Sequence, residues 1–87
     1  MARSWFFGKN STYVGHSNDG HHYNHNNEYV GHSNDGYHYN RNNQYVGHTN
    51  AYGEHFDSQN RYCGRTDPYT GYIYDANGNY VGHKSDD

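Results

Sequence analysis

The chain has 87 residues, a formal net charge of −3 and a pI near 6.3, which argues against the basic surface that nucleic-acid binding requires. Hydrophobic residues make up only 30% of the chain and none of them is leucine, which excludes an ordinary aliphatic core. Aromatic residues make up 18%, however, and include twelve tyrosines. We therefore expect an ordered protein in which tyrosine takes the place of leucine.

A repeat of sixteen to eighteen residues organises the chain from its N-terminal region onward. Each copy opens with tyrosine, a small apolar residue and glycine, as in YVGHSNDGHHYNHNNE and YVGHSNDGYHYNRNNQ. The copies begin at Tyr13, Tyr29, Tyr45, Tyr62 and Tyr80. Phe7 precedes Tyr13 by six residues, the spacing that also separates Tyr23 from Tyr29, so the N-terminus supplies the missing half of the last copy. The chain is therefore expected to form five hairpins, each with an aromatic pair.

Turn-forming residues recur at fixed positions in each copy and predict hairpins. The residues that open one set of loops have side chains that bond their own turn: Asn24, Asn40, Asp57 and Asp75. Three residues later stand residues that tolerate the left-handed conformation: Asn27, Asn43, Asn60 and Gly78. The alternate connections contain SNDG, with Gly20 and Gly36 in the left-handed position, and Pro68 fits a turn better than a strand.

These signals predict one all-β domain over residues 1–87. We expect an antiparallel meander of about five pseudo-repeated hairpins and no helix, because no apolar pattern of helical period is present. The hairpins would form a compact flower or barrel, or a short solenoid.

Alternation along the strands predicts two unlike faces. If Ser17 pairs with His21, then His16 faces His22 and Gly15 faces Tyr23. We expect the tyrosine–glycine face to be packed, with aromatic rings lying across the glycines. The other face would carry the valines and the histidines.

On that register three histidine pairs lie directly across neighbouring strands, with Cβ atoms about 5 Å apart. The pairs are His16–His22, His32–His38 and His48–His55. Two such imidazoles could hold zinc, nickel or copper. Paired histidines on a wet face need no ligand, so we expect no required cofactor.

The segment GYIYDANGNYVGH, residues 71–83, resembles the aromatic hairpin repeats of bacterial choline- and glucan-binding modules. It is also similar to YD-type repeats and to small β-flower domains built from hairpins of the form YDxxGxxVG. The β-flower resemblance implies a compact, pseudo-symmetric arrangement of hairpins. It implies no particular chemistry.

For function, we predict a non-catalytic module that binds carbohydrate or a cell-surface polymer. No serine–histidine–acid spacing, phosphate loop or zinc-protease motif is present, and the histidines recur at equivalent positions as catalytic groups seldom do. The tyrosines outside the repeated pairs are the candidate ligand contacts: Tyr37, Tyr52, Tyr69 and Tyr72.

Two alternatives stay open beside this prediction. One is metal binding by the histidine pairs. The other is a self-assembling structural protein, a homo-oligomer in which the edge strands at 5–9 and 79–84 add to those of other copies.

The remaining expectations concern location and the thiol. The sequence shows no signal peptide and no apolar segment of membrane-spanning length, so we expect no membrane partner and a cytoplasmic, virion-associated or non-classically exported protein. Cys63 is the only cysteine, which excludes an internal disulfide. It occupies the valine position of the repeat and is expected to be a small packed side chain.

Overall fold

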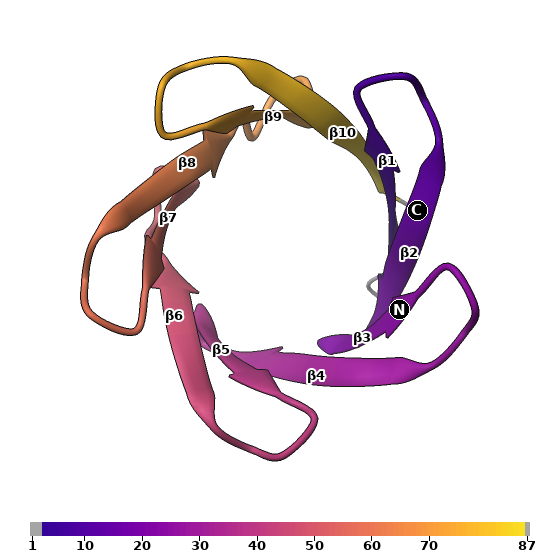
Figure 1. Cartoon of the computed structure of the whole chain (residues 1–87), viewed down its shortest axis with the longest axis vertical. Coiled ribbons are helices and arrows are strands. Elements are labelled where there is room, and N and C mark those ends of the chain that lie inside the picture. Colours follow the sequence, from indigo (N-terminus) through magenta and orange to yellow (C-terminus); the bar gives the residue numbers. More distant parts are fainter. Residues whose placement is uncertain (1–2, 87) are drawn as a thin grey trace.

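The computed structural model describes residues 3–86 as ten antiparallel strands that close into a barrel (Figure 1). The strands are β1 (Arg3–Gly8), β2 (Tyr13–Asn18), β3 (His21–Asn24), β4 (Tyr29–Asn34), β5 (Tyr37–Asn40), β6 (Tyr45–Thr49), β7 (Glu54–Asp57), β8 (Tyr62–Thr66), β9 (Tyr72–Asp75) and β10 (Tyr80–Asp86). The expected all-β hairpin meander is confirmed, in its barrel form. Residues 1, 2 and 87 of the expected domain lie outside the described part. Within that part, no helix is long and apolar enough to cross a membrane.

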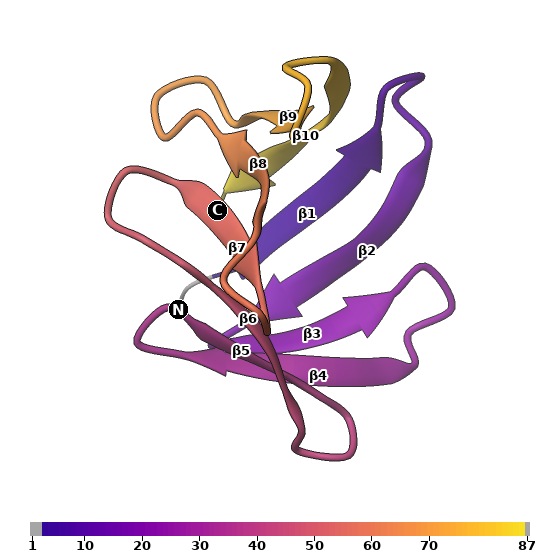
Figure 2. The same ribbon diagram turned by 60° about the vertical axis from the view of Figure 1, so that its left-hand side comes forward.

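Closure of the barrel joins the two ends of the chain. β1 supplies the second half of the repeat that β10 begins, and Phe6 pairs with Lys84 where the first three copies pair histidine with serine or threonine. In Figure 2, β1 and β10 lie side by side. The two strands expected to be free edges therefore pair with each other, and the prediction of edge-to-edge oligomers loses its basis within residues 3–86.

The turns at one end of the barrel form as their residues predict. The Asn24 side-chain oxygen accepts hydrogen bonds from the backbone N–H groups of Asn26 and Glu28, at 2.9 and 3.0 Å. Asn40, Asp57 and Asp75 repeat this arrangement. The positions assigned to left-handed backbone have φ between 63° and 83°. These loops project outward like petals in Figure 1.

The turns at the other end are one residue shorter than expected, which corrects the predicted register. Asp19 and Gly20 both have positive φ, as in a two-residue turn, and Asn18 therefore pairs with His21. Ser17 then faces His22, and His16 faces Tyr23. A slip of one residue exchanges the faces of a strand, so the prediction of a packed tyrosine face is wrong.

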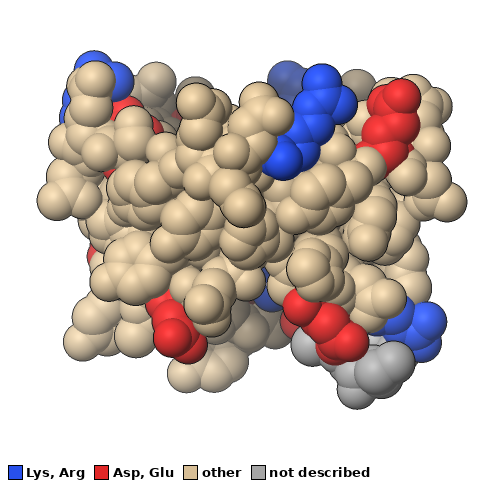
Figure 3. Space-filling model, turned by 90° about the horizontal axis from the view of Figure 1, so that it is seen from below, with Lys and Arg blue, Asp and Glu red and all other residues tan. Residues whose placement is uncertain are grey.

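The tyrosines and their aromatic partners instead form the outer wall. All five expected aromatic pairs are present, with ring centroids between 5.8 and 6.2 Å apart. Rings also stack across the other strand pairs in the combinations His83–Phe7, His16–Tyr23, His32–Tyr39 and His48–Phe56, each at 4.9 Å. In the fourth copy the guanidinium carbon of Arg65 lies 4.4 Å from the centroid of the Tyr74 ring. Figure 3 shows charged side chains toward the two rims and an uncharged middle band on the face it presents.

The interior is lined mostly by glycine and polar side chains and has no buried apolar core within residues 3–86. Among residues 3–86 no hydrophobic side chain is buried, whereas Ser17 is 8% exposed. At each copy the strand bulges beside the valine position, and the glycine that follows lies against a neighbouring backbone. A Cβ atom on Gly31 would lie 2.1 Å from the Tyr39 carbonyl oxygen. Close backbone approach, not an overlying ring, therefore explains the repeated glycines.

Candidate functional site

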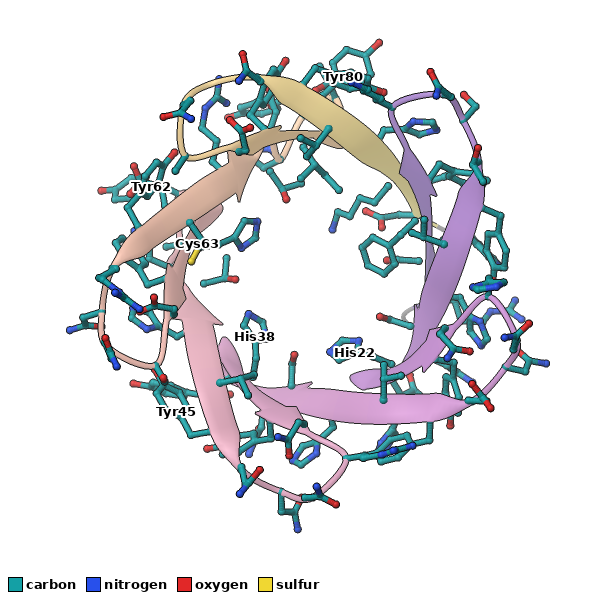
Figure 4. All side chains as sticks on the ribbon, in the orientation of Figure 1. His22, His38, Tyr45, Tyr62, Cys63 and Tyr80 are labelled. Carbon is teal, nitrogen blue, oxygen red and sulfur yellow. The ribbon has the colours of Figure 1, made fainter. Side chains whose placement is uncertain are left out.

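An arc of polar side chains on the inner face of the barrel, from β2 to β8, is the principal polar feature of the structure. Strands alternate in what they contribute, a hydroxyl from one strand and an imidazole from the next. In chain order the members are Ser17, His22, Ser33, His38, Thr49, His55 and Thr66. Figure 4 shows His22 and His38 directed into the interior. We call this set the hydroxyl–imidazole chain.

Each imidazole of the chain is hydrogen-bonded on both ring nitrogens. His38 Nε2 lies 2.7 Å from Thr49 Oγ1, and its Nδ1 bonds to Ser33 Oγ. His55 lies between two threonines, with Nδ1 2.7 Å from Thr49 Oγ1 and Nε2 2.7 Å from Thr66 Oγ1. His22 bonds in the same way to Ser17 and Ser33. Six hydrogen bonds therefore run without a break from β2 to β8.

The chain is satisfied in either of two directions when all its imidazoles are neutral. A hydroxyl donates one proton and can accept two, and a neutral imidazole has one donor and one acceptor nitrogen. If Ser17 donates to His22 Nδ1, every later group donates toward Thr66. If Thr66 donates to His55 Nε2, every group donates toward Ser17. Both patterns use all six bonds.

Burial keeps the imidazoles of the chain neutral. It lowers the pKa of His22, His38 and His55, because a half-buried imidazolium loses hydration. Neighbouring imidazoles lower these pKa values further, and the ammonium group of Lys84 adds to the effect at His55. The interior therefore resists positive charge near neutral pH.

The regular pattern ends on the arc formed by β9, β10 and β1. Ile73 and Phe6 stand where the other copies have histidine, and Lys84 stands where they have serine or threonine. None of the three continues the hydroxyl–imidazole chain. A cavity of about 340 Å³ opens beside this arc. It is lined by Phe6, His38, His55, Thr66, Pro68 and Lys84, with Thr49 and Gly53.

Lys84 stands at the edge of this cavity. It also lines a second cavity of about 300 Å³ beside the Pro68 turn. Its Nζ lies 3.6 Å from an oxygen of Asp86, and the Ser4 hydroxyl donates to that same oxygen at 2.5 Å. The ammonium group is therefore only loosely held by its carboxylate partner.

The tyrosines predicted to contact a ligand do not meet in one site. Tyr37 and Tyr72 lie on the outer wall, beside Tyr45 and Tyr80 respectively. Tyr52 and Tyr69 lie in turns and are 79% and 96% exposed. Only Tyr69 borders one of the two cavities, the one beside the Pro68 turn.

The predicted metal-binding pairs are not formed. His16, His32 and His48 lie on the outer wall, stacked on aromatic rings. Their expected partners His22, His38 and His55 lie on the opposite, inner face because of the corrected register. Across residues 3–86 no group of three or more histidine, cysteine or acidic residues could hold a metal ion.

The cavity residues Phe6, Pro68 and Lys84 were missed by the sequence analysis. The signal that could have found them is departure from the repeat. Aligning the copies on the corrected register places each of these residues opposite a different residue type in the other copies. The tyrosines that lie outside the repeated pairs do not build this cavity, whereas Phe6 and Lys84 depart from the repeat at interior positions and line it.

No family model, no curated protein and no solved structure matches this chain. The function must therefore be argued from the geometry of the interior.

Proposed function

We propose that the barrel binds a small polar ligand, the size of a single sugar ring, in its interior cavity. One observation carries the proposal: residues that depart from the repeat converge on this cavity. A purely structural barrel would be satisfied by repeating serine and histidine around its whole interior. Phe6 instead takes a histidine position and Lys84 a serine or threonine position at the wall of one cavity of about 340 Å³, which Pro68 of the adjoining turn also lines. That volume is at the lower end of the range for small-molecule sites.

The lining suits a ligand with an apolar face and a polar edge, as in a sugar ring. The Phe6 ring and Pro68 present carbon surfaces. Thr66, at the end of the hydroxyl–imidazole chain, presents a hydroxyl that can donate or accept, because the chain runs in either direction. Lys84 adds a cation. Carbohydrate is accordingly the class that we favour.

We propose binding without catalysis. Each cavity imidazole already bonds to two hydroxyls, so neither His38 nor His55 presents a free nitrogen as a general base.

Titration of the ¹⁵N-labelled protein with a panel of monosaccharides tests the proposal by NMR. We expect amide shifts at Phe6, Gly53 and Lys84, and a weaker response in Phe6→Leu. Phe7→Leu is the matched control, because Phe7 lies on the outer wall against His83. Folding of both variants is checked by circular dichroism. Shifts confined to Tyr37 and Tyr72 would move the site to the outer wall, and no shifts with any sugar would overturn the proposal.

A further inference from the structure

We propose that the cavity selects an organic anion, and that binding of its carboxylate is coupled to uptake of one proton from solvent by the hydroxyl–imidazole chain. This inference rests on the proposed function and names the ligand class. It also assigns to the hydroxyl–imidazole chain the role of proton acceptor.

The charge on the cavity wall favours an anion. Lys84 is the one charged residue that lines the cavity within residues 3–86, and no carboxylate lines it. The nearest acidic partner, Asp86, is 3.6 Å from the Lys84 Nζ and already accepts a bond from Ser4. A ligand carboxylate would therefore meet an ammonium group in a partly enclosed space, where charge–charge attraction is stronger than in bulk water.

The hydroxyl–imidazole chain has room for one added proton. If His38 is protonated, it donates to both Ser33 and Thr49. Ser33 then donates away from His38 toward His22, and Thr49 donates away from it toward His55. All six hydrogen bonds are kept, and the same holds when the proton is on either of the other two imidazoles.

A second proton does not fit in the same way. With two imidazoles protonated, one hydroxyl between them receives hydrogen bonds from both sides, and its own proton has no acceptor in the chain. The two positive charges also repel each other. The geometry therefore sets the capacity at one proton.

The end of the chain couples this proton to the ligand. The neutral chain directs the Thr66 hydroxyl proton outward in only one of its two directions, whereas with the added proton His55 always donates to Thr66, so the Thr66 proton is always directed out of the chain. Thr66 and Lys84 line the same cavity. The protonated chain thus offers a hydroxyl donor beside the ammonium group, and a carboxylate there stabilises the added charge.

The groups that face the interior are limited. The titratable ones are His22 on β3, His38 on β5, His55 on β7, Cys63 on β8, and Lys84 with its partner Asp86 on β10. The neighbouring strands contribute Phe6, Ser17, Ser33, Thr49, Thr66 and Ile73, none of which titrates near neutral pH. Behind the wall, His21, His32 and His48 add repulsion that opposes protonation. Without ligand, the hydroxyl–imidazole chain is therefore neutral. A bound anion raises its proton affinity, so that one proton is taken up from solvent.

The test uses D-glucuronate and D-glucose, which differ at one carbon by carboxylate or hydroxymethyl. Calorimetry at pH 7 in Bis-Tris and in Tris counts the protons taken up, because the two buffers differ in ionisation enthalpy and neither is an anion that would compete for the site. We expect glucuronate to bind at least tenfold more tightly than glucose, with proton uptake approaching one per site. Lys84→Thr, which restores the hydroxyl of the repeat, should bring the two affinities together.

Ring ¹⁵N spectra of the histidines test the chain itself. In the complex, His22, His38 and His55 should all shift together toward the protonated form. In Ser33→Ala the His22 response should disappear while the other two remain, and Ser33→Thr should restore it.

The outcomes separate the two proposals. Equal affinity for the two sugars overturns the anion inference and leaves the proposed function standing. Tighter glucuronate binding with no proton uptake overturns the coupling. Failure of both sugars to bind overturns the anion inference, and failure of the whole monosaccharide panel overturns the proposed function itself.

Discussion

Two arcs of the barrel interior share one backbone plan and differ in their side chains. From β2 to β8, hydroxyls and imidazoles satisfy one another all along the wall. Across β9, β10 and β1 the same positions carry Ile73, Lys84 and Phe6, which make no such chain. The repeated hydroxyls and imidazoles stabilise the barrel. The residues that depart from the repeat give it a specific cavity.

We expect the largest loss of stability at the repeated glycines, which both arcs share. Gly31→Ala would place a Cβ 2.1 Å from the Tyr39 carbonyl oxygen, at a φ of 156° that side chains avoid. We expect a loss on the order of 4 kcal/mol of unfolding free energy, measured by urea denaturation. Gly82→Ala, on the irregular arc, should cost as much because its Cβ would meet the Phe7 carbonyl oxygen at 2.1 Å.

Gly78→Ala is the control for those two variants. Like Gly31, and unlike Gly82, it has positive φ, at 83°, but no atom lies within 4 Å of an added Cβ. It should cost only about 1 kcal/mol, the strain of the left-handed backbone alone. Equal costs for Gly31→Ala and Gly78→Ala would show that backbone strain, not the close approach of strands, explains Gly31.

The next largest loss of stability is expected for a variant in the regular arc, from β2 to β8, alone. Ser33→Ala removes the hydroxyl between His22 and His38 and leaves one nitrogen of each without its partner. We expect a loss of about 1–3 kcal/mol in the same denaturation experiment. Ser33→Thr should stay near the wild-type value, since threonine occupies this place at position 49. A neutral Ser33→Ala would mean that water replaces the hydroxyl at no cost.

Acidification should also act through the regular arc. The pKa values of His22, His38 and His55 are lowered by folding, so the unfolded chain binds more protons at these positions. Stability is therefore fully present above the unfolded pKa of about 6.5 and falls as pH drops through it toward the folded values. Denaturation midpoints from pH 8 to pH 5 check the sign. In His55→Ile, which copies position 73, the slope should be smaller.

The smallest expected effect is at the valine position. Cys63 is exposed, and its Sγ donates a 3.4 Å hydrogen bond to the Arg61 carbonyl oxygen. Figure 4 shows its side chain on the inner side of the wall. Cys63→Val restores the residue of the other copies and should change the unfolding free energy by less than about 0.5 kcal/mol. A larger loss would assign the thiol a role that the valines do not have.

The sequence by itself determined the repeat, the hairpins, the aromatic pairs and the turn residues. These are local properties, because Asn24 bonds its own loop and Phe7 meets Tyr13 across a single hairpin. Six-residue spacing and asparagine-rich loops are enough to specify them.

Only the tertiary structure decided the faces, the closure and the site. The two-residue turn at Asp19–Gly20 shifts the register by one, and one residue is the whole difference between inside and outside on a strand. Closure then brings Phe6 beside Lys84, residues from opposite ends of the chain. No local sequence pattern predicts that contact, because it forms only when β1 pairs with β10 and closes the barrel.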